Sequence, residues 1–156
     1  MDNTVNGAEG LLTEQNLAVI HQHAIEEFPR EACGFILASG VRRARNVIDE
    51  LHAADPDSYE RTSATGYALG IEDAIFLDAS FDTDDPVLVI YHSHPNGRAY
   101  FSEEDVRRAL LDGRPVYPGV LQLVVGVEGG SVREARLFDF ADGAYREISY
   151  PGAVPA

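Results

Sequence analysis

The sequence has few of the features that place a chain in a membrane, in an oxidising compartment or on a polyanion. Its 156 residues include one cysteine, Cys33, which excludes an internal disulfide and a zinc site of four thiolates. The longest unbroken apolar run extends only from Val87 to Tyr91, far too short for a membrane span. The N-terminal stretch has neither a cationic segment nor an apolar core, so we expect no signal peptide and a cytoplasmic protein.

Positive charge is also scarce. Lysine and arginine number 12 against 26 aspartates and glutamates, which gives a net charge of −14 at neutral pH. This charge repels phosphate backbones and anionic lipids, so we expect no nucleic-acid or membrane-surface binding. Apolar residues at 45% and charged residues at 24% are typical of a globular protein. The length predicts a flexible lead (1–10), one domain (11–150) and a flexible tail (151–156).

The hydrophobic pattern predicts an α/β fold. Helices are expected over residues 13–28, 71–81 and 102–113, from apolar residues at helical spacing and from stop residues. Strands are expected over residues 34–38, 41–48, 87–91, 120–127, 132–138 and 144–148. The stretch 49–66 has no clear period, so we expect mostly loop there, with a short strand near Thr62.

Residues 92–105, HSHPNGRAYFSEED, have the pattern of a catalytic site. Side chains two apart on a strand point to the same side, so His92 and His94 can direct both imidazoles to one point. If a helix begins at Ser102, Asp105 lies in its first turn with its carboxylate near the strand end. Two histidines and one aspartate can therefore converge.

Such a set suits a catalytic metal ion. Two imidazoles and a carboxylate leave a fourth tetrahedral position open for water, which is typical of catalytic zinc. Zinc activates water and polarises a carbonyl, so amide hydrolysis further needs a proton acceptor and an oxyanion donor. Glu31, between the first helix and the first strand, can be the general base, and Ser102 can donate to the oxyanion. Ser102 and Asp105 also fit a simple helix-capping pair.

This set resembles the metal-binding signature of the JAMM family, the JAB/MPN metalloproteases. In that signature an upstream Glu is followed by His-x-His, ten residues and an Asp, with a Ser three residues before the Asp. Residues 28–37, FPREACGFIL, also resemble the family's junction of first helix and first strand. The resemblance covers residues 11 to about 148 and implies a mixed β-sheet flanked by helices, the α–β–α architecture of MPN and cytidine-deaminase-like folds. It implies Glu31 as general base, Ser102 as helper of the tetrahedral intermediate, and as Zn²⁺ ligands His92, His94 and Asp105.

The resemblance also implies an activity. Family members cleave peptide or isopeptide bonds after the C-terminus of ubiquitin or ubiquitin-like proteins, including bacterial sulfur carriers, and this compact chain is similar to the small prokaryotic members. We therefore expect a zinc peptidase or isopeptidase acting on the C-terminal tail of a ubiquitin-like or sulfur-carrier protein. Release of a carrier from an amino-acid adduct and removal of a modifier from protein targets are both open. The alternative is a catalytically idle MPN-type scaffold that binds protein partners.

Other polar and aromatic residues have less specific assignments. Arg98, Tyr100 and Phe101 lie in the loop between the expected ligands, where they either contact substrate or anchor the loop. Cys33 is expected to be a buried, inert thiol. The two histidines of the first helix do not share a face and are expected at solvated positions. A zinc deaminase is excluded because His-x-Glu and a second cysteine are missing.

Overall fold

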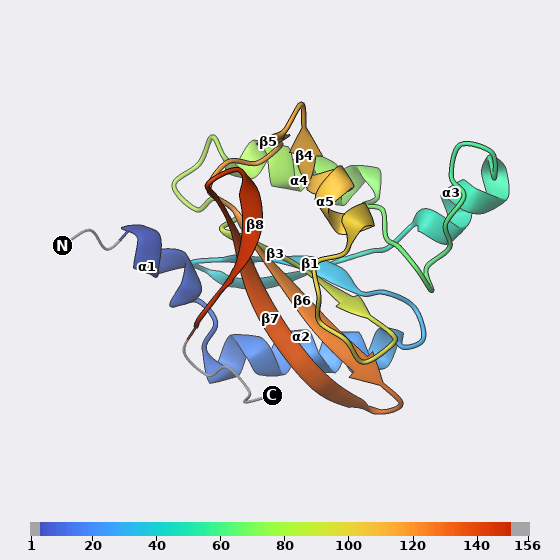
Figure 1. The fold of residues 1–156 in the computed structure, drawn as a ribbon, viewed down its shortest axis with the longest axis horizontal. Coiled ribbons are helices and arrows are strands. Elements are labelled where there is room, and N and C mark those ends of the chain that lie inside the picture. Colours follow the sequence, from blue (N-terminus) through green and yellow to red (C-terminus); the bar gives the residue numbers. More distant parts are fainter. Residues whose placement is uncertain (1–3, 151–156) are drawn as a thin grey trace.

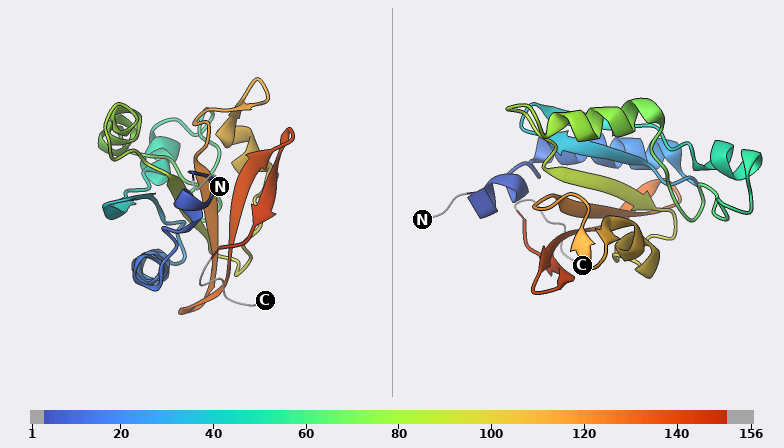
Figure 2. Two further views of the ribbon diagram at one scale, coloured as in Figure 1. Left: turned by 90° about the vertical axis from the view of Figure 1, so that its left-hand side faces the viewer. Right: turned by 90° about the horizontal axis from the view of Figure 1, so that it is seen from above.

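The fold is built around one mixed six-stranded sheet with helices on both faces (Figures 1 and 2). The computed structural model describes residues 4–150, with side chains from residue 7 onward. The strand order is β2-β1-β3-β6-β7-β8, and β3 and β6 form its one parallel pair. β4 and β5 form a separate two-stranded sheet. This architecture confirms the predicted α/β class with a mixed sheet flanked by helices.

The elements follow the predicted order, with additions. The strands are β1 (Cys33–Leu37), β2 (Gly40–Ala44), β3 (Val89–His94), β4 (Leu110–Leu111), β5 (Arg114–Pro115), β6 (Leu121–Glu128), β7 (Ser131–Ala141) and β8 (Ala144–Ile148). The helices are α1 (Thr4–Glu9), α2 (Glu14–Glu27), α3 (Ile48–Ala54), α4 (Ile71–Ser80) and α5 (Glu103–Ala109). α1 lies within the segment expected to be a lead, and the expected tail, 151–156, lies outside the described residues. Among the described helices, none combines the length and apolarity needed to cross a membrane.

α2 covers one face of the sheet. Thr13 caps this helix, because its hydroxyl accepts the backbone N–H of Asn16 at 3.1 Å. The core on this side consists of Leu12, Leu17, Ile20, Ala24, Ile36, Val89, Tyr91, Leu121, Leu123, Val125, Val127, Ala135, Leu137 and Tyr150. His23 of α2 is only 5% exposed, and its Nδ1 lies 2.7 Å from Tyr91 Oη. The expectation of a solvated position was wrong for His23, because the hydroxyl of Tyr91 gives the buried ring a polar partner.

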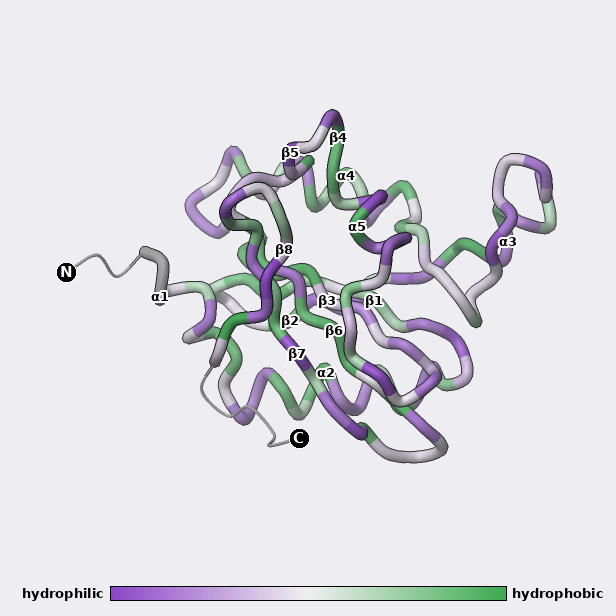
Figure 3. Tube along the Cα trace, viewed as in Figure 1, coloured by the Kyte–Doolittle hydropathy of each residue, from purple (hydrophilic) through white to green (hydrophobic). Residues whose placement is uncertain are grey.

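α4 packs on the opposite face of the sheet. The core there consists of Cys33, Phe35, Leu37, Ala44, Leu77, Val87, Ile90 and Val120. Figure 3 shows how hydrophobic residues concentrate on the central strands. Cys33 is fully buried and has no disulfide, and burial raises the pKa of its thiol. The prediction that this thiol is buried is thereby confirmed.

The stretch 49–66 agrees with the prediction only in part. Residues 55–66 are loop as expected, but residues 49–54 belong to α3, and Thr62 lies in no strand. The preceding strand ends at Ala44 rather than at Ile48. The helix forms because the side-chain oxygen of Asn46 accepts the backbone N–H of Ile48 at 3.1 Å, and acidic residues occupy its first turn. Asp49, which indicated loop in the sequence, here lies in the first turn of a helix.

The helix expected to reach Gly113 ends at Ala109 and is followed by the β4–β5 hairpin. Asp112 and Gly113 both have positive φ, 53° and 77°, as a two-residue hairpin turn requires. The same dipeptide type at Asp142 and Gly143, with φ of 53° and 82°, joins β7 to β8 as predicted. After α5, therefore, the Asp-Gly turn favours a hairpin at residues where helical spacing predicted that the helix continues.

Candidate metal centre

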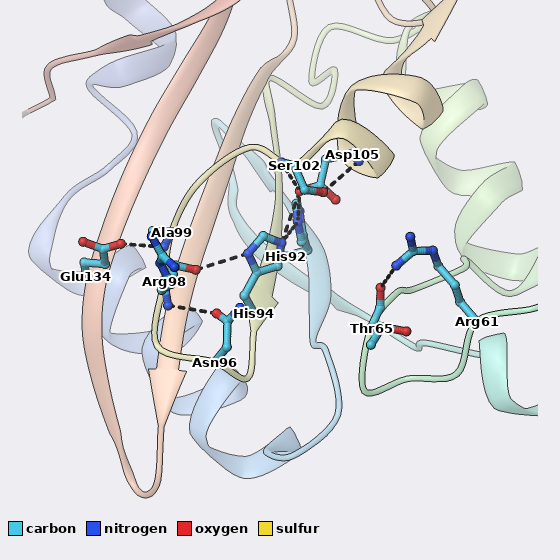
Figure 4. A network of polar contacts seen from close by, with 10 residues as sticks. All are labelled: Arg61, Thr65, His92, His94, Asn96, Arg98, Ala99, Ser102, Asp105 and Glu134. Carbon is cyan, nitrogen blue, oxygen red and sulfur yellow. Dashed lines mark hydrogen bonds and ion pairs between the residues drawn. The ribbon is translucent and has the colours of Figure 1, made fainter.

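Three side chains converge where β3 ends and α5 begins (Figure 4). Nε2 of His92 lies 3.1 Å from Nε2 of His94. Oδ2 of Asp105 lies 3.1 Å from the first of these nitrogens and 3.2 Å from the second. The three atoms form a nearly equilateral triangle that is almost fully buried, since the side chains are 1%, 7% and 10% exposed. The convergence expected from the spacing is therefore present.

The strand and the helix cap explain this convergence. β3 alternates its side chains between the two faces of the sheet, so both histidines point toward the α4 and α5 side. Ser93, between them, points to the other face, where its hydroxyl accepts the backbone N–H of Ala32 at 2.8 Å. The first turn of α5 brings the carboxylate of Asp105 over the end of the strand.

Ser102 and Asp105 form a reciprocal capping box at the start of α5. The hydroxyl of Ser102 accepts the backbone N–H of Asp105 at 3.0 Å, and Oδ2 of Asp105 accepts the backbone N–H of Ser102 at 3.0 Å. That same Oδ2 faces the two histidines. Capping and convergence on the histidines are therefore compatible, although the sequence left them as competing interpretations.

The triangle fits a tetrahedral zinc ion. Ligand distances of about 2.0–2.2 Å place tetrahedral donor atoms about 3.3 Å apart, close to the separations found here. Glu31, His92 and His94 also form a buried group whose ligand atoms lie within 4.8 Å of one another, which is a possible metal site. Asp105 is the nearer carboxylate, at 3.1 and 3.2 Å, so we treat it as the third donor and Glu31 as a neighbour of the site.

The electrostatics favour an ionised Asp105. Burial acts to raise the pKa of Asp105. The charge of His92, together with hydrogen bonds to His92, to His94 and to the backbone of Ser102, outweighs burial and holds the pKa well below its usual range. Burial acts to lower the pKa of His94, but its hydrogen bonds to Asp105 and Arg98 and the charges of Glu31 and Asp105 together outweigh burial and raise the pKa. The site therefore combines one buried carboxylate anion with two imidazoles. A divalent cation bound there would neutralise the negative charge of the carboxylate.

Glu31 lies beside the triangle and is held there by its backbone. It is 4% exposed, and its N–H donates to the carbonyl of Ser63 at 2.6 Å. Its own carbonyl accepts the side-chain amide of Asn46 at 2.9 Å. Burial raises the pKa of the Glu31 carboxylate, which moves it toward the range of a base that works near neutral pH. The chain thus places a buried carboxylate next to the donor triangle.

The triangle faces a cleft of about 570 Å³. One wall is the segment around Arg61 and Thr65, whose mutual hydrogen bond is drawn in Figure 4. The other wall is the loop 95–102. Ser102 and Tyr100 of this loop line the cleft, and Tyr100 is 47% exposed.

The three loop residues offered as substrate contacts have different surroundings. Tyr100 lines the cleft, with its ring 5.0 Å from that of His94. The backbone carbonyl of Arg98 lies 3.1 Å from Nδ1 of His94, so this residue supports a histidine through its main chain. Phe101 packs against Phe138 and Tyr145, with ring separations of 5.5 and 4.7 Å, which is the arrangement of a loop anchor.

The sequence did not indicate several residues that hold the site in place. The side chain of Asn46 makes four hydrogen bonds, and its partners are Glu31, Gly66, Ile48 and Ala68. Glu134 of β7 accepts the backbone N–H of Ala99 at 2.7 Å and so fixes the ligand loop. Their partners lie up to 35 residues away, so no local spacing could have identified them.

The chain is similar to one protein family and to solved structures. Residues 13–138 match the family of prokaryotic homologs of the JAB domain. No match was found among curated proteins. The solution structure of a protein from Desulfitobacterium hafniense is similar, with a TM-score of 0.63 and 18% identity over 88% of each chain. One from Salinibacter ruber has a TM-score of 0.55 and 22% identity, covering 92% of this chain and 94% of the other.

At these identities the two solved structures show the fold alone. The family match carries the assignment, since it extends from α2 through most of β7 and includes Glu31 and the whole segment 92–105. Because this match spans most of the sequence, the chain belongs to the prokaryotic branch of the JAB/MPN domain family.

Proposed function

We propose that the protein is a zinc-dependent peptidase or isopeptidase. Its substrate is the bond after the C-terminus of a ubiquitin-like or sulfur-carrier protein. The observation that carries this proposal is the buried donor triangle of His92, His94 and Asp105 with the carboxylate of Glu31 beside it. A buried carboxylate next to such donors matches the general base that metal-assisted hydrolysis requires.

Each residue has a distinct role in the proposed reaction. The two imidazoles and the Asp105 carboxylate would hold Zn²⁺, which when bound supplies Lewis-acid polarisation of a carbonyl and a more acidic water. Glu31 accepts a proton from the attacking water and delivers it to the nitrogen of the leaving amine as the C–N bond breaks. The raised pKa of Glu31 suits both transfers, because the group must accept and release a proton in one cycle.

Ser102 is placed to stabilise the developing oxyanion. Its hydroxyl oxygen already accepts the N–H of Asp105, so its O–H hydrogen is free to donate into the cleft that it lines. The capping bond also fixes the direction of the hydroxyl. Preorganised donors of this kind act mainly on the transition state, so loss of Ser102 lowers turnover more than binding.

The cleft supports an extended tail as the substrate. Its volume of about 570 Å³ suits a few residues with small side chains, and the exposed ring of Tyr100 offers an apolar contact at its rim. A flexible tail of a carrier or modifier has such residues and can reach the buried donors, whereas a folded surface cannot.

The test uses purified protein loaded with zinc and assayed on two substrates. One is a carrier protein with an amino acid on its C-terminus, and the other is a ubiquitin-like protein in isopeptide linkage to a target. We expect about one zinc per chain and chelator-sensitive cleavage. Glu31→Gln is expected to keep zinc but lose about 10²–10⁴-fold in kcat, while Glu26→Gln, on the surface of α2, retains activity.

Two outcomes contradict the proposal. Equal turnover by wild type and Glu31→Gln removes the mechanism. Protein without zinc and without chelator-sensitive activity favours the idle scaffold instead. The preferred substrate then separates the two biological settings: cleavage of the amino-acid adduct indicates carrier release, and cleavage of the isopeptide indicates removal of a modifier.

A further inference from the structure

The two histidines of the triangle are held in different ways. Metal-binding histidines usually donate their second ring N–H to a carboxylate, a carbonyl or water, and this bond fixes the ring. His94 follows this rule, because its Nδ1 lies 3.1 Å from the carbonyl of Arg98. Nδ1 of His92 is buried and has no hydrogen-bond partner among residues 4–150. Within residues 4–150 the polar partners of the His92 ring are on its Nε2 side, so contacts other than a hydrogen bond must hold its Nδ1 side.

Apart from the other triangle histidine, His94, whose ring lies edge-on at 4.9 Å, Tyr67 provides the closest aromatic contact to this ring. The rings of Tyr67 and His92 are stacked, with centroids 5.1 Å apart and an interplanar angle of 28°. Phe101 is the other aromatic neighbour, but it is tilted by 55° at 6.4 Å. A stacked ring restricts rotation of an imidazole about χ2, because turning it out of the parallel arrangement brings its edge into the face of the partner.

Tyr67 is itself held firmly in place. The side chain of Asn46 bonds the residues on both sides of it, the carbonyl of Gly66 at 3.1 Å and the N–H of Ala68 at 3.0 Å. Arg108 of α5 donates to the carbonyl of Tyr67, and its guanidinium carbon lies 4.5 Å from the centre of the Tyr67 ring. The ring is therefore a fixed surface tied to the same helix that carries Asp105.

We propose that Tyr67 is a positioning residue for His92, because its ring replaces the missing hydrogen bond and keeps Nε2 directed toward His94 and Asp105. This inference rests on the proposed zinc site. Tyr67 does not touch the reacting atoms, and it acts only through the orientation of His92. The ring, rather than its hydroxyl, carries the effect, so phenylalanine should replace tyrosine and leucine should not.

The first test measures zinc affinity by competition with a chelator. Tyr67→Leu is expected to weaken zinc binding about tenfold or more, as loss of an orienting contact usually does, while Tyr67→Phe stays close to wild type. Tyr117→Leu is the matched control. Tyr67 and Tyr117 both line a pocket of about 190 Å³. Tyr117, however, stacks on Phe81, with ring centroids 5.6 Å apart, instead of on His92. The visible spectrum of the cobalt-loaded protein should change in Tyr67→Leu alone.

Unchanged zinc affinity in Tyr67→Leu overturns the proposal. An equal loss of zinc affinity in Tyr67→Leu, Tyr67→Phe and Tyr117→Leu also overturns it, because such a loss indicates general disruption of the structure. A second measurement needs neither metal nor a stable leucine variant. In NMR spectra of metal-free wild-type protein, the ring protons of His92 should be shifted upfield and show contacts to the Tyr67 ring. Absence of both also overturns it. If wild type binds no zinc, the proposed function fails, and the NMR result still decides how His92 is oriented.

Discussion

One carboxylate oxygen of Asp105 lies 3.2 Å from Nε2 of His94 and also accepts the backbone N–H of Ser102 at 3.0 Å. The third donor of the triangle is therefore fixed by the cap of α5. Its position depends on whether the helix starts correctly, so the donor set is assembled by folding and needs little rearrangement when a cation binds.

The double role of Asp105 can be separated by substitution. Asp105→Asn retains an oxygen that can accept the N–H of Ser102, but it loses the negative charge. Because the fold stabilises the ionised carboxylate, we expect Asp105→Asn to lower the free energy of unfolding of the metal-free protein by about 1 kcal/mol and to bind zinc far more weakly. Asp105→Ala loses both the capping oxygen and the negative charge, so its free energy of unfolding should be about 1 kcal/mol lower than that of Asp105→Asn. Urea unfolding and chelator competition measure the two effects, and equal stability of the two variants contradicts the role in capping.

Ser102→Ala should reduce both stability and turnover. Loss of the cap costs about 1 kcal/mol, and loss of the oxyanion donor lowers kcat about 10²–10³-fold. Thr13→Ala is the matched control, because it removes the cap of α2, where the hydroxyl accepts the N–H of Asn16 at 3.1 Å. We expect the control to lose similar stability with unchanged kcat. If both variants lose turnover equally, Ser102 acts only through stability.

Gly126 is required by the loop that holds His94. The two residues are paired across the parallel strands β3 and β6, and a Cβ on Gly126 would lie 2.5 Å from the backbone of Gly97. Gly126→Ala should therefore displace this loop, destabilise the protein by about 1–3 kcal/mol and weaken zinc binding. Gly130→Ala, where no atom lies within 4 Å of the added carbon, should change neither quantity. Thermal unfolding and chelator competition check both expectations.

His23 should make stability depend on pH. Burial lowers its pKa from the usual 6.5, and the nearby charge of Arg43 acts in the same direction. Below about pH 6.5 the unfolded chain takes up a proton that the folded chain does not, so the free energy of unfolding falls as the pH drops. His23→Leu should reduce the dependence of the free energy of unfolding on pH by up to about 1.4 kcal/mol per pH unit. Urea unfolding between pH 5 and 7 measures it.

The remaining slope in that variant combines His21, whose pKa burial also lowers, with His94 and Glu31, whose raised pKa values act with the opposite sign. The variant should also lose about 1 kcal/mol near neutral pH, because the hydroxyl of Tyr91 loses its partner at 2.7 Å. An unchanged pH slope in His23→Leu shows that the buried imidazole is not responsible.

Local patterns predicted most of the fold, and they failed where a distant partner decides the structure. α2, α4 and the strands β6 to β8 follow from helical or alternating spacing and from turn residues such as Asp142 and Gly143. α3 was missed because Asn46, which accepts the N–H of Ile48, is itself held by Gly66 and Ala68, 20 and 22 residues away. His23 was placed in solvent because its partner, Tyr91, is 68 residues away in the chain.

The sequence by itself determined the donor set of the site. Strand alternation directs His92 and His94 to one side, and a cap at Ser102 brings Asp105 back to the strand end, because both relationships are set by spacing along the backbone. Only the tertiary structure decided how these side chains are held. The contacts of Tyr67 with His92, of Asn46 with Glu31 and of Glu134 with Ala99 join distant segments, and such contacts exist only after the sheet and helices have packed.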